Sequence, residues 1–158
     1  DAIFRKKTAV EVAYQVESYL SQGGKVRARL TAPYMKRYVV DSPYIEFSKT
    51  LHVDFFQDSQ LVESTLDALF ARHMEFQRKA WIRDSVVVIN KWKGDTLRTN
   101  ELWWDQNAEE FYTDKPVRIR TKTEIIDGMG MESSQDFKNW RILHSVGRIS
   151  VPASSFPN

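Results

Sequence analysis

The sequence predicts an all-β protein whose two antiparallel sheets pack face to face, as in a β-sandwich or jelly roll. Apolar and polar residues alternate with period two in many short windows, and turn signals separate the windows about every 8 to 12 residues. A further observation is a pattern in which an apolar residue is followed two places on by a small residue and five places on by another small or apolar residue. It occurs as Leu30, Ala32 and Met35; Leu66, Ala68 and Ala71; Leu97, Thr99 and Leu102; and Ile126, Gly128 and Met131.

The N-terminal part predicts a β-hairpin. Six residues alternate on one face of its first strand: Val10, Val12, Tyr14, Val16, Ser18 and Leu20. Gly23 and Gly24 provide the positive φ that a tight turn needs, and the apolar alternation resumes at Val26 on the returning strand. Pro33 and Pro43 lack a backbone donor, so the segment between them is expected at an edge or a corner.

The stretch from residue 60 to 81 is open to two interpretations. Leu66, Leu69, Phe70, His73 and Met74 would suit one side of a helix. The recurring pattern instead places residues 62–68 on a strand, and we follow the pattern. The alternation before and after this stretch predicts strands over residues 51–55, 86–89, 96–104, 117–121, 124–131 and 140–144, with a last strand at 148–151 that Gly147 opens.

The composition limits the possible functions. The chain has 158 residues, with 23 Lys and Arg against 21 Asp and Glu, so its net charge of +2 argues against a nucleic-acid partner. It has no cysteine, and no apolar run approaches the length that spans a membrane. His52, His73 and His144 have no metal-ligand spacing, and no catalytic or nucleotide-binding motif occurs. We therefore expect no metal, no cofactor and no enzymatic activity.

Several segments together resemble the LptC family of periplasmic lipopolysaccharide-export proteins, in the form found in Bacteroides-type bacteria. The segments are KVRARLTAPYMKRY from residue 25, PYIEFSKTLHVDFF from 43, VESTLDALFA from 62, GDTLRTNELWWDQ from 94, FYTDKPVRIRT from 111 and IIDGMGMESSQDF from 125. Two features depart from the family: its N-terminal membrane anchor is absent, and Asp84 and Ser85 stand where a Gly or Asn is expected.

The resemblance implies an open, V-shaped antiparallel β-jelly roll that holds the acyl chains of lipopolysaccharide between its two sheets. It also implies a position in the periplasm between an inner-membrane ABC transporter and a bridge protein of the LptA type, with an anchor in the inner membrane. A single domain is expected over residues 8–151, between an N-terminal tail at 1–7, from which the anchor is removed, and a C-terminal tail at 152–158.

Strand phase assigns twelve residues to the lipid-binding inner face. They are Val26, Ala28, Leu30, Val53, Phe55, Leu66, Ala68, Leu97, Val117, Ile119, Ile126 and Gly128. The small residues among them would leave room between the sheets. Without the resemblance, the same residues would be interpreted as ordinary core contacts.

The two ends of the chain are predicted to supply the strands that join partner proteins, because an unpaired sheet edge can accept a strand from a neighbour. The residues assigned to these edge strands are Val10, Val12, Tyr14, Ile142, Ile149 and Val151.

The five tryptophans leave an alternative open, a carbohydrate-binding β-sandwich whose exposed indoles stack on sugar rings. Trp103 and Trp104 are adjacent, so one of them must point outward from a strand. Outward tryptophans in β proteins are more often cross-strand packing partners.

Overall fold

The fold consists entirely of β-strands in the part of the chain that the structure describes. The computed structural model describes residues 9–57 and 61–151, so both expected tails lie outside it. The strands are β1 (Ala9–Gln22), β2 (Lys25–Val39), β3 (Tyr44–Phe47), β4 (Leu51–Phe56), β5 (Val62–Ala68), β6 (Phe70–Met74), β7 (Lys79–Asn90), β8 (Asp95–Asp105), β9 (Glu110–Arg120), β10 (Glu124–Ser134) and β11 (Trp140–Ser150). The predicted all-β class is confirmed, including the strand assignment of residues 62–68.

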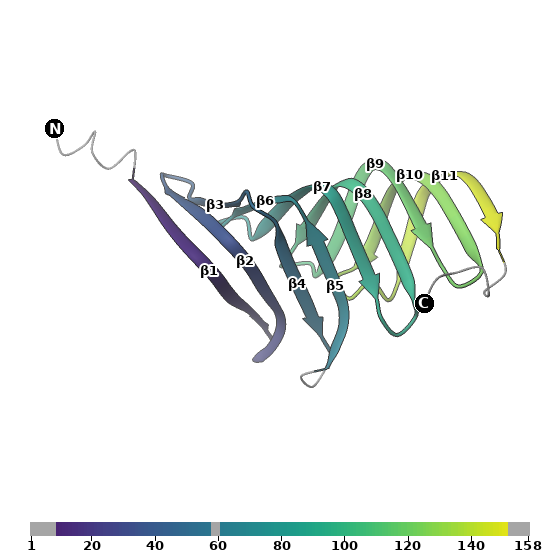
Figure 1. The fold of residues 1–158 in the computed structure, drawn as a ribbon, viewed down its shortest axis with the longest axis horizontal. Helices are drawn as coiled ribbons and strands as arrows, with labels where there is room; N and C mark the ends of the chain where they lie inside the picture. Colours follow the sequence, from purple (N-terminus) through teal and green to yellow (C-terminus); the bar gives the residue numbers. More distant parts are fainter. Residues whose placement is uncertain (1–8, 58–60, 152–158) are drawn as a thin grey trace.

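All strand pairings are antiparallel and connect into one continuous sheet. Its order is β11-β10-β9-β8-β7-β5-β4-β2-β3-β6, with β1 paired to β2 and β6 also paired to β7. Figure 1 shows the strands following one another along the long axis, with β1 at one end and β11 at the other. These two strands each have an edge that no other described strand covers.

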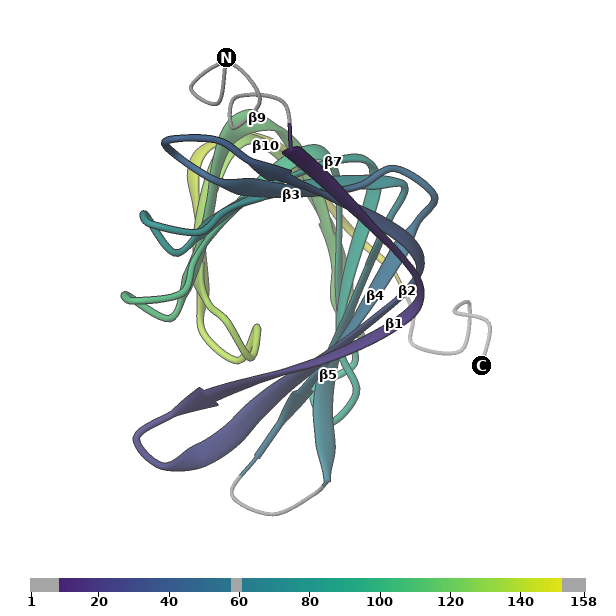
Figure 2. The ribbon, with the colours of Figure 1, turned by 90° about the vertical axis from the view of Figure 1, so that its left-hand side faces the viewer.

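The sheet folds over on itself because the long strands change partners halfway along. The first half of β7 pairs with β6 through residues 79–83, and its second half pairs with β5 through residues 87–90. Likewise, β2 pairs with β4 before its midpoint and with β3 after it. The result is two layers, which we call the β4 layer and the β6 layer after the short strand that each contains. Figure 2, viewed along the long axis, shows the sheet curled around its interior, which is the predicted jelly roll.

A corner crosses the strands where the two layers meet. It is marked by residues with a left-handed backbone, namely Gln15 (φ 52°), Asp84 (φ 70°), Ser85 (φ 52°) and Gly130 (φ 80°). The register of β7 against β8 shifts at the same point, between Arg83 and Val86. Extra residues of this kind bend a strand and increase its twist. The Asp84–Ser85 departure from the family therefore lies at a position that a Gly or Asn would adopt with less strain.

The corner explains the recurring sequence pattern. The second and third positions of the pattern are three residues apart, and in an uninterrupted strand they would face opposite sides of the sheet. The corner lies between them, so both face the interior. Ala68 and Ala71 are both buried, as are Thr99 and Leu102.

The same reversal corrects the prediction that alternate residues from Val10 to Leu20 share one face. Gln15 interrupts β1, whose pairing passes from Tyr14 opposite Tyr34 to Val16 opposite Ala32. Val16 and Leu20 pack against the core. Tyr14 is 70% exposed, and Val10 and Val12 are exposed as well.

A second correction concerns β11, which is one strand and not two. Gly147 lies inside β11 and pairs with Asp127 of β10, so it does not open a separate strand. The pairing skips Val146, which is the extra residue of a bulge.

At Ser85, in the corner, we expect a substitution by glycine to raise stability, whereas glycine within a strand usually lowers it. This residue is exposed, so its substitution changes little packing. Ser85→Gly should raise stability by up to about 1 kcal/mol because it removes left-handed strain, whereas Ser85→Val should lower it by about 1 to 2 kcal/mol. Urea unfolding measures both. The exposed Ser145 has no positive φ and is the control, where glycine should be the worse residue. If the glycine and valine variants ranked in the same order of stability at both positions, the strain at Ser85 would be ruled out.

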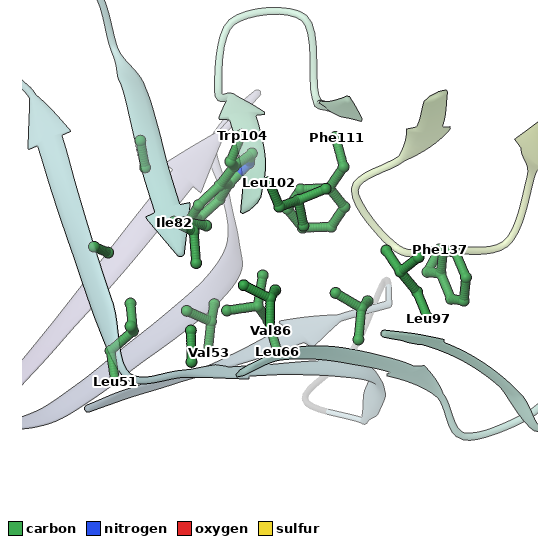
Figure 3. Close-up of a cluster of buried hydrophobic side chains, with 14 of the residues drawn as sticks. Leu51, Val53, Leu66, Ile82, Val86, Leu97, Leu102, Trp104, Phe111 and Phe137 are labelled. Atoms are coloured by element: carbon green, nitrogen blue, oxygen red, sulfur yellow. The ribbon is translucent and has the colours of Figure 1, made fainter. Parts of the chain in front are cut away.

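The core lies between the two layers. Figure 3 shows Leu51, Val53 and Leu66 facing Ile82, Leu102 and Trp104 across the interior. The first three belong to the β4 layer and the others to the β6 layer. Packing is dense toward β11, where Leu97, Phe111 and Ile119 have no exposed surface. Toward β1 the interior is not completely filled by side chains.

Candidate functional site

A cavity of about 590 Å³ lies between the two layers at the β1 end of the molecule. Its apolar lining comes from seven strands and comprises Val16, Leu20, Ala28, Leu30, Met35, Ile45, Phe47, Leu51, Ala71, Ala80, Ile82 and Trp104. The cavity reaches the surface, because Glu17, Tyr19 and Arg78 also line it and are exposed. Its size and apolar walls are those of a small-molecule or lipid site.

Three of the polar side chains that line this cavity, His73, Glu75 and Gln106, have hydrogen-bond partners. The Nε2 of His73 lies 3.2 Å from the Oε1 of Gln106. The Nε of Arg37 donates to Glu75 over 2.7 Å and its Nη1 donates to Glu11 over 2.7 Å. This ion pair lowers the pKa of Glu75. Burial lowers the pKa of His73, so its imidazole is neutral at pH 7.

Two histidines should give opposite contributions to stability as the pH changes. His52, on the outer face, loses some proton affinity to burial, but its contacts with Asp67 and Asp54 outweigh this and raise its pKa. Its contribution is therefore present below the unfolded pKa and lost as the pH rises through the raised folded pKa. The lowered pKa of His73 has the opposite effect, because the unfolded chain takes up that proton first.

We expect acidification from about pH 8 to about pH 5 to separate the two variants His73→Leu and His52→Gln. The first should gain stability relative to the wild type, because a group that resists protonation is gone. The second should lose stability relative to the wild type. Urea unfolding at both pH values measures this, and a constant difference from the wild type in either variant would contradict the corresponding assignment.

The loop between β10 and β11 covers the interior beside the β7–β8 turn. Phe137 of this loop has no exposed surface, and its ring stacks on Trp140 with centroids 6.4 Å apart. The Nδ2 of Asn90 donates to the carbonyl of Asp136 over 3.0 Å, and the Nζ of Lys93 donates to the carbonyl of Lys138 over 2.7 Å. Figure 2 shows the yellow-green end of the β10–β11 hairpin turning into the interior.

Three glutamines and a tryptophan extend this closure toward the cavity. The Nε2 of Gln22 donates to the carbonyl of Gln106 over 2.9 Å, and the Nε2 of Gln135 donates to the Oε1 of Gln22 over 2.9 Å. The Nε1 of Trp104 donates to the Oε1 of Gln135 over 3.1 Å. These bonds join the β1–β2 hairpin, the β8–β9 turn and the β10–β11 loop.

Ten of the twelve predicted inner-face residues divide into two groups in the structure. Ala28 and Leu30 line the cavity. Most of the others are buried in the dense core and do not line it: Val53, Phe55, Leu66, Ala68, Leu97, Val117, Ile119 and Ile126. A role in lipid binding stays a prediction for Ala28 and Leu30. For the buried core residues, such a role would require the core packing to change.

Val26 and Gly128 do not fit their prediction. Val26 is two residues from Ala28, but the pairing of β1 with β2 skips Arg27 between them, and Val26 is 46% exposed. At Gly128, an added Cβ would lie 2.3 Å from Ile142 and 2.8 Å from the carbonyl oxygen of His144. Glycine is needed there because β10 and β11 approach closely, so a bulky residue would disturb folding first.

Strand phase missed most of the cavity lining. Met35 and Ala71 occupy the third position of the recurring pattern, and they line the cavity from the β6 layer. Strict alternation from Leu30 or Leu66 assigns both to the outer face. The recurring pattern contains the missing information. The three-residue step between its second and third positions marks the corner, beyond which the third residue faces the interior.

The free edges of the sheet expose apolar side chains. On β1 these are Val10, Val12 and Tyr14, and on β11 they are Leu143, Val146 and Ile149. Two residues assigned to the second edge are placed differently. Ile142 is partly buried against the core, and Val151 follows the end of β11, where its N–H donates to the carbonyl of Thr123.

The outward tryptophans of β7 and β8, Trp81 and Trp103, pack on each other and on neighbouring strands, while Trp92 in the β7–β8 turn is 50% exposed. The ring of Trp103 lies 6.4 Å from that of Trp81 and 6.3 Å from that of Tyr112, centroid to centroid. Trp104 faces the interior and is 3% exposed. The row is thus a set of cross-strand contacts, which does not favour the carbohydrate-binding alternative.

Neither a metal cluster nor a membrane helix is found in the part of the chain described. No group of three or more His, Cys, Asp or Glu among these residues could hold a metal ion. No helix there is long and apolar enough to cross a membrane.

Comparison with known proteins gave one family and a group of solved structures. The family described as "Lipopolysaccharide-assembly, LptC-related" matches residues 8–148. Comparison with curated proteins gave no match. Among solved structures, the chain is similar to LptH, the LptA homologous periplasmic component of the lipopolysaccharide transport device of Pseudomonas aeruginosa, with 16% identity and a TM-score of 0.41 over 63% of this chain and 78% of that chain. Since the family match covers nearly the whole chain, the protein belongs to the LptC-related lipopolysaccharide-assembly family.

Proposed function

We propose that this protein is a non-enzymatic carrier that binds the acyl chains of lipopolysaccharide in the cavity at the β1 end. The observation that supports this most strongly is the cavity itself, about 590 Å³ in volume and apolar on walls from both layers. A fully packed interior would have no place for a ligand. Membership of the LptC-related family supplies the identity of the lipid.

The physical need for such a site follows from the hydrophobic effect. Each methylene moved out of water contributes about 0.8 kcal/mol, so a chain of about twelve carbons exposed in the periplasm would cost on the order of 10 kcal/mol. Leu30 and Met35 provide the contacts that replace water on opposite sides of the cavity. The neutral His73 adds no charge that an acyl chain would have to desolvate.

The free edges suggest how the carrier is placed between partners. We infer that β1 pairs with the periplasmic part of an inner-membrane ABC transporter, and that β11 pairs with a bridge protein of the LptA type. Both edges have unpaired backbone groups and exposed apolar side chains, which suits strand addition. In the full-length protein, an N-terminal segment would anchor the domain in the inner membrane.

Lipid that co-purifies with the protein tests the proposed function. The protein is expressed in the periplasm of a Gram-negative host, purified without detergent and analysed by native mass spectrometry. We expect adducts with the mass of lipopolysaccharide or lipid A, and their loss when the cavity is filled by Leu30→Trp with Met35→Trp. A protein that binds soluble polysaccharide but no lipid would contradict the proposal and favour the carbohydrate-binding alternative.

The β11 edge can be tested separately from the cavity. Ile149→Asp places a charge on a side chain that is 58% exposed on the edge strand. We expect at least a tenfold loss of affinity for an LptA-type protein, because a charge buried in an apolar contact must be desolvated. Lipid binding should be unchanged. Val26→Asp, near the opposite end of the molecule, is the control, and equal bridge binding by both variants would contradict the assignment.

A further inference from the structure

An aromatic cluster forms the inner end of the cavity. Trp104 lines the cavity, and behind it lie Phe55 and Phe111, which do not. The ring centroid of Phe55 is 5.2 Å from that of Trp104 and 5.6 Å from that of Phe111, and the rings meet edge to face. Phe55 belongs to the β4 layer and the other two to the β6 layer, so the cluster spans the interior from one layer to the other.

The interior beyond this cluster holds no space for a ligand. Leu97, Leu102, Ile119, Met131 and Phe137 lie on that side and have no exposed surface. The β10–β11 loop covers them, as its hydrogen bonds to Asn90 and Lys93 show. The cavity is therefore open at its rim and blind at Trp104.

The indole of Trp104 is held in place and is not a loose core side chain. Its Nε1–H donates to Gln135 over 3.1 Å, and Gln135 in turn donates to Gln22 over 2.9 Å. Gln135 is itself buried. Turning the indole aside would leave the amide oxygen of Gln135 without this partner, which is unfavourable in the interior.

We propose that Trp104 determines the length of acyl chain that the cavity accepts. This inference rests on the proposed function, since it assumes that acyl chains enter from the rim. Each methylene up to the indole adds buried apolar surface, and methylenes beyond it meet occupied volume. Affinity therefore rises with chain length until the chain end contacts Trp104 and then stops rising.

Saturated fatty acids of increasing chain length test this proposal, with displacement of a fluorescent fatty acid as the readout. For the wild type, affinity should rise about fourfold per methylene and then reach a plateau. For Trp104→Ala, the plateau should move to longer chains, with a gain of about fourfold for each methylene that the vacated space admits. Trp103→Ala is the matched control, because Trp103 is next to Trp104 in the sequence but its side chain packs on the outer face. Its plateau should equal that of the wild type.

The outcomes separate this proposal from the proposed function. If the wild type binds no fatty acid of any length, the proposed function fails and the length limit fails with it. If the wild type binds them but Trp104→Ala keeps the same plateau, only the role of Trp104 is overturned. Should Trp104→Ala fail to fold, Trp104→Leu keeps more of the packing and should move the plateau by a smaller step. An unchanged plateau in that folded variant overturns the proposal equally.

Discussion

A double variant that fills the cavity, Leu30→Trp with Met35→Trp, is expected to bind lipopolysaccharide about 50-fold more weakly than the wild type. The estimate corresponds to the loss of contact with roughly three methylenes, at about 0.8 kcal/mol each. Leu30 and Met35 line the cavity from different layers and are only partly buried. Larger side chains can therefore extend into the cavity without displacing the dense core. Binding is measured by displacement of a fluorescent lipid from the refolded, delipidated protein.

The matched control is Val26→Trp, on the same strand as Leu30 but beyond the bulge at Arg27. Val26 is 46% exposed and does not line the cavity, so an indole there adds bulk outside the binding site. The control should bind lipid as the wild type does. Equal weakening in both variants would mean that lipid binds at the hairpin surface, and full binding by the double variant would remove the cavity from the account.

Phe137→Ala is expected to have the largest effect on stability, a loss of about 3 to 5 kcal/mol. Phe137 has no exposed surface, although it belongs to a loop, and it fills the interior between the layers near Trp140. Its removal leaves a void that the hydrogen-bonded ends of the loop prevent from closing. Urea unfolding at neutral pH measures the free energy of unfolding.

Phe76→Ala is the corresponding surface control. Phe76 is 74% exposed in the turn between β6 and β7, so its truncation should change stability by no more than about 0.5 kcal/mol. A small loss at Phe137 would show that the β10–β11 loop does not stabilise the interior. That result would also mean that Trp104 does not form a fixed inner end of the cavity.

The sequence predicts the strands well because period-two alternation records burial directly. Leu51, Val53 and Phe55 alternate and are all buried on β4. The ambiguous stretch from residue 60 to 81 shows the limit of periodicity. There the sheet turns its corner between β5 and β6, so the buried face changes between Ala68 and Ala71 and strict alternation is lost.

The cavity was harder to predict because phase gives the face of a residue and not its neighbours. Leu30 and Leu66 have the same place in the recurring pattern, yet only Leu30 lines the cavity. The difference comes from the opposite layer and from Phe137, which fills the interior from a loop. Alternation says nothing about a loop that folds inward, so strand phase alone assigns the filled half of the interior to lipid as well.

The edges illustrate a similar limit. The exposed side chains of Val10 and Tyr14 follow from the reversal at Gln15, a residue with no local signal for a positive φ. On β11, the bulge at Val146 moves the pattern by one residue. The sequence therefore predicted the strand but misplaced a face in β1, and it predicted two strands where β11 is one.

The position of a bound acyl chain is the most direct test of the central claim, that lipid lies between the layers at the β1 end. A fatty acid with a spin label near its methyl end can be bound to protein whose methyl groups are observed by NMR. We expect selective broadening of the methyl signals of Leu30, Met35 and Ile45, which line the cavity, with those of Leu143, Val146 and Ile149 unaffected. Broadening at the β11 methyl groups with sharp signals from the cavity would contradict the account.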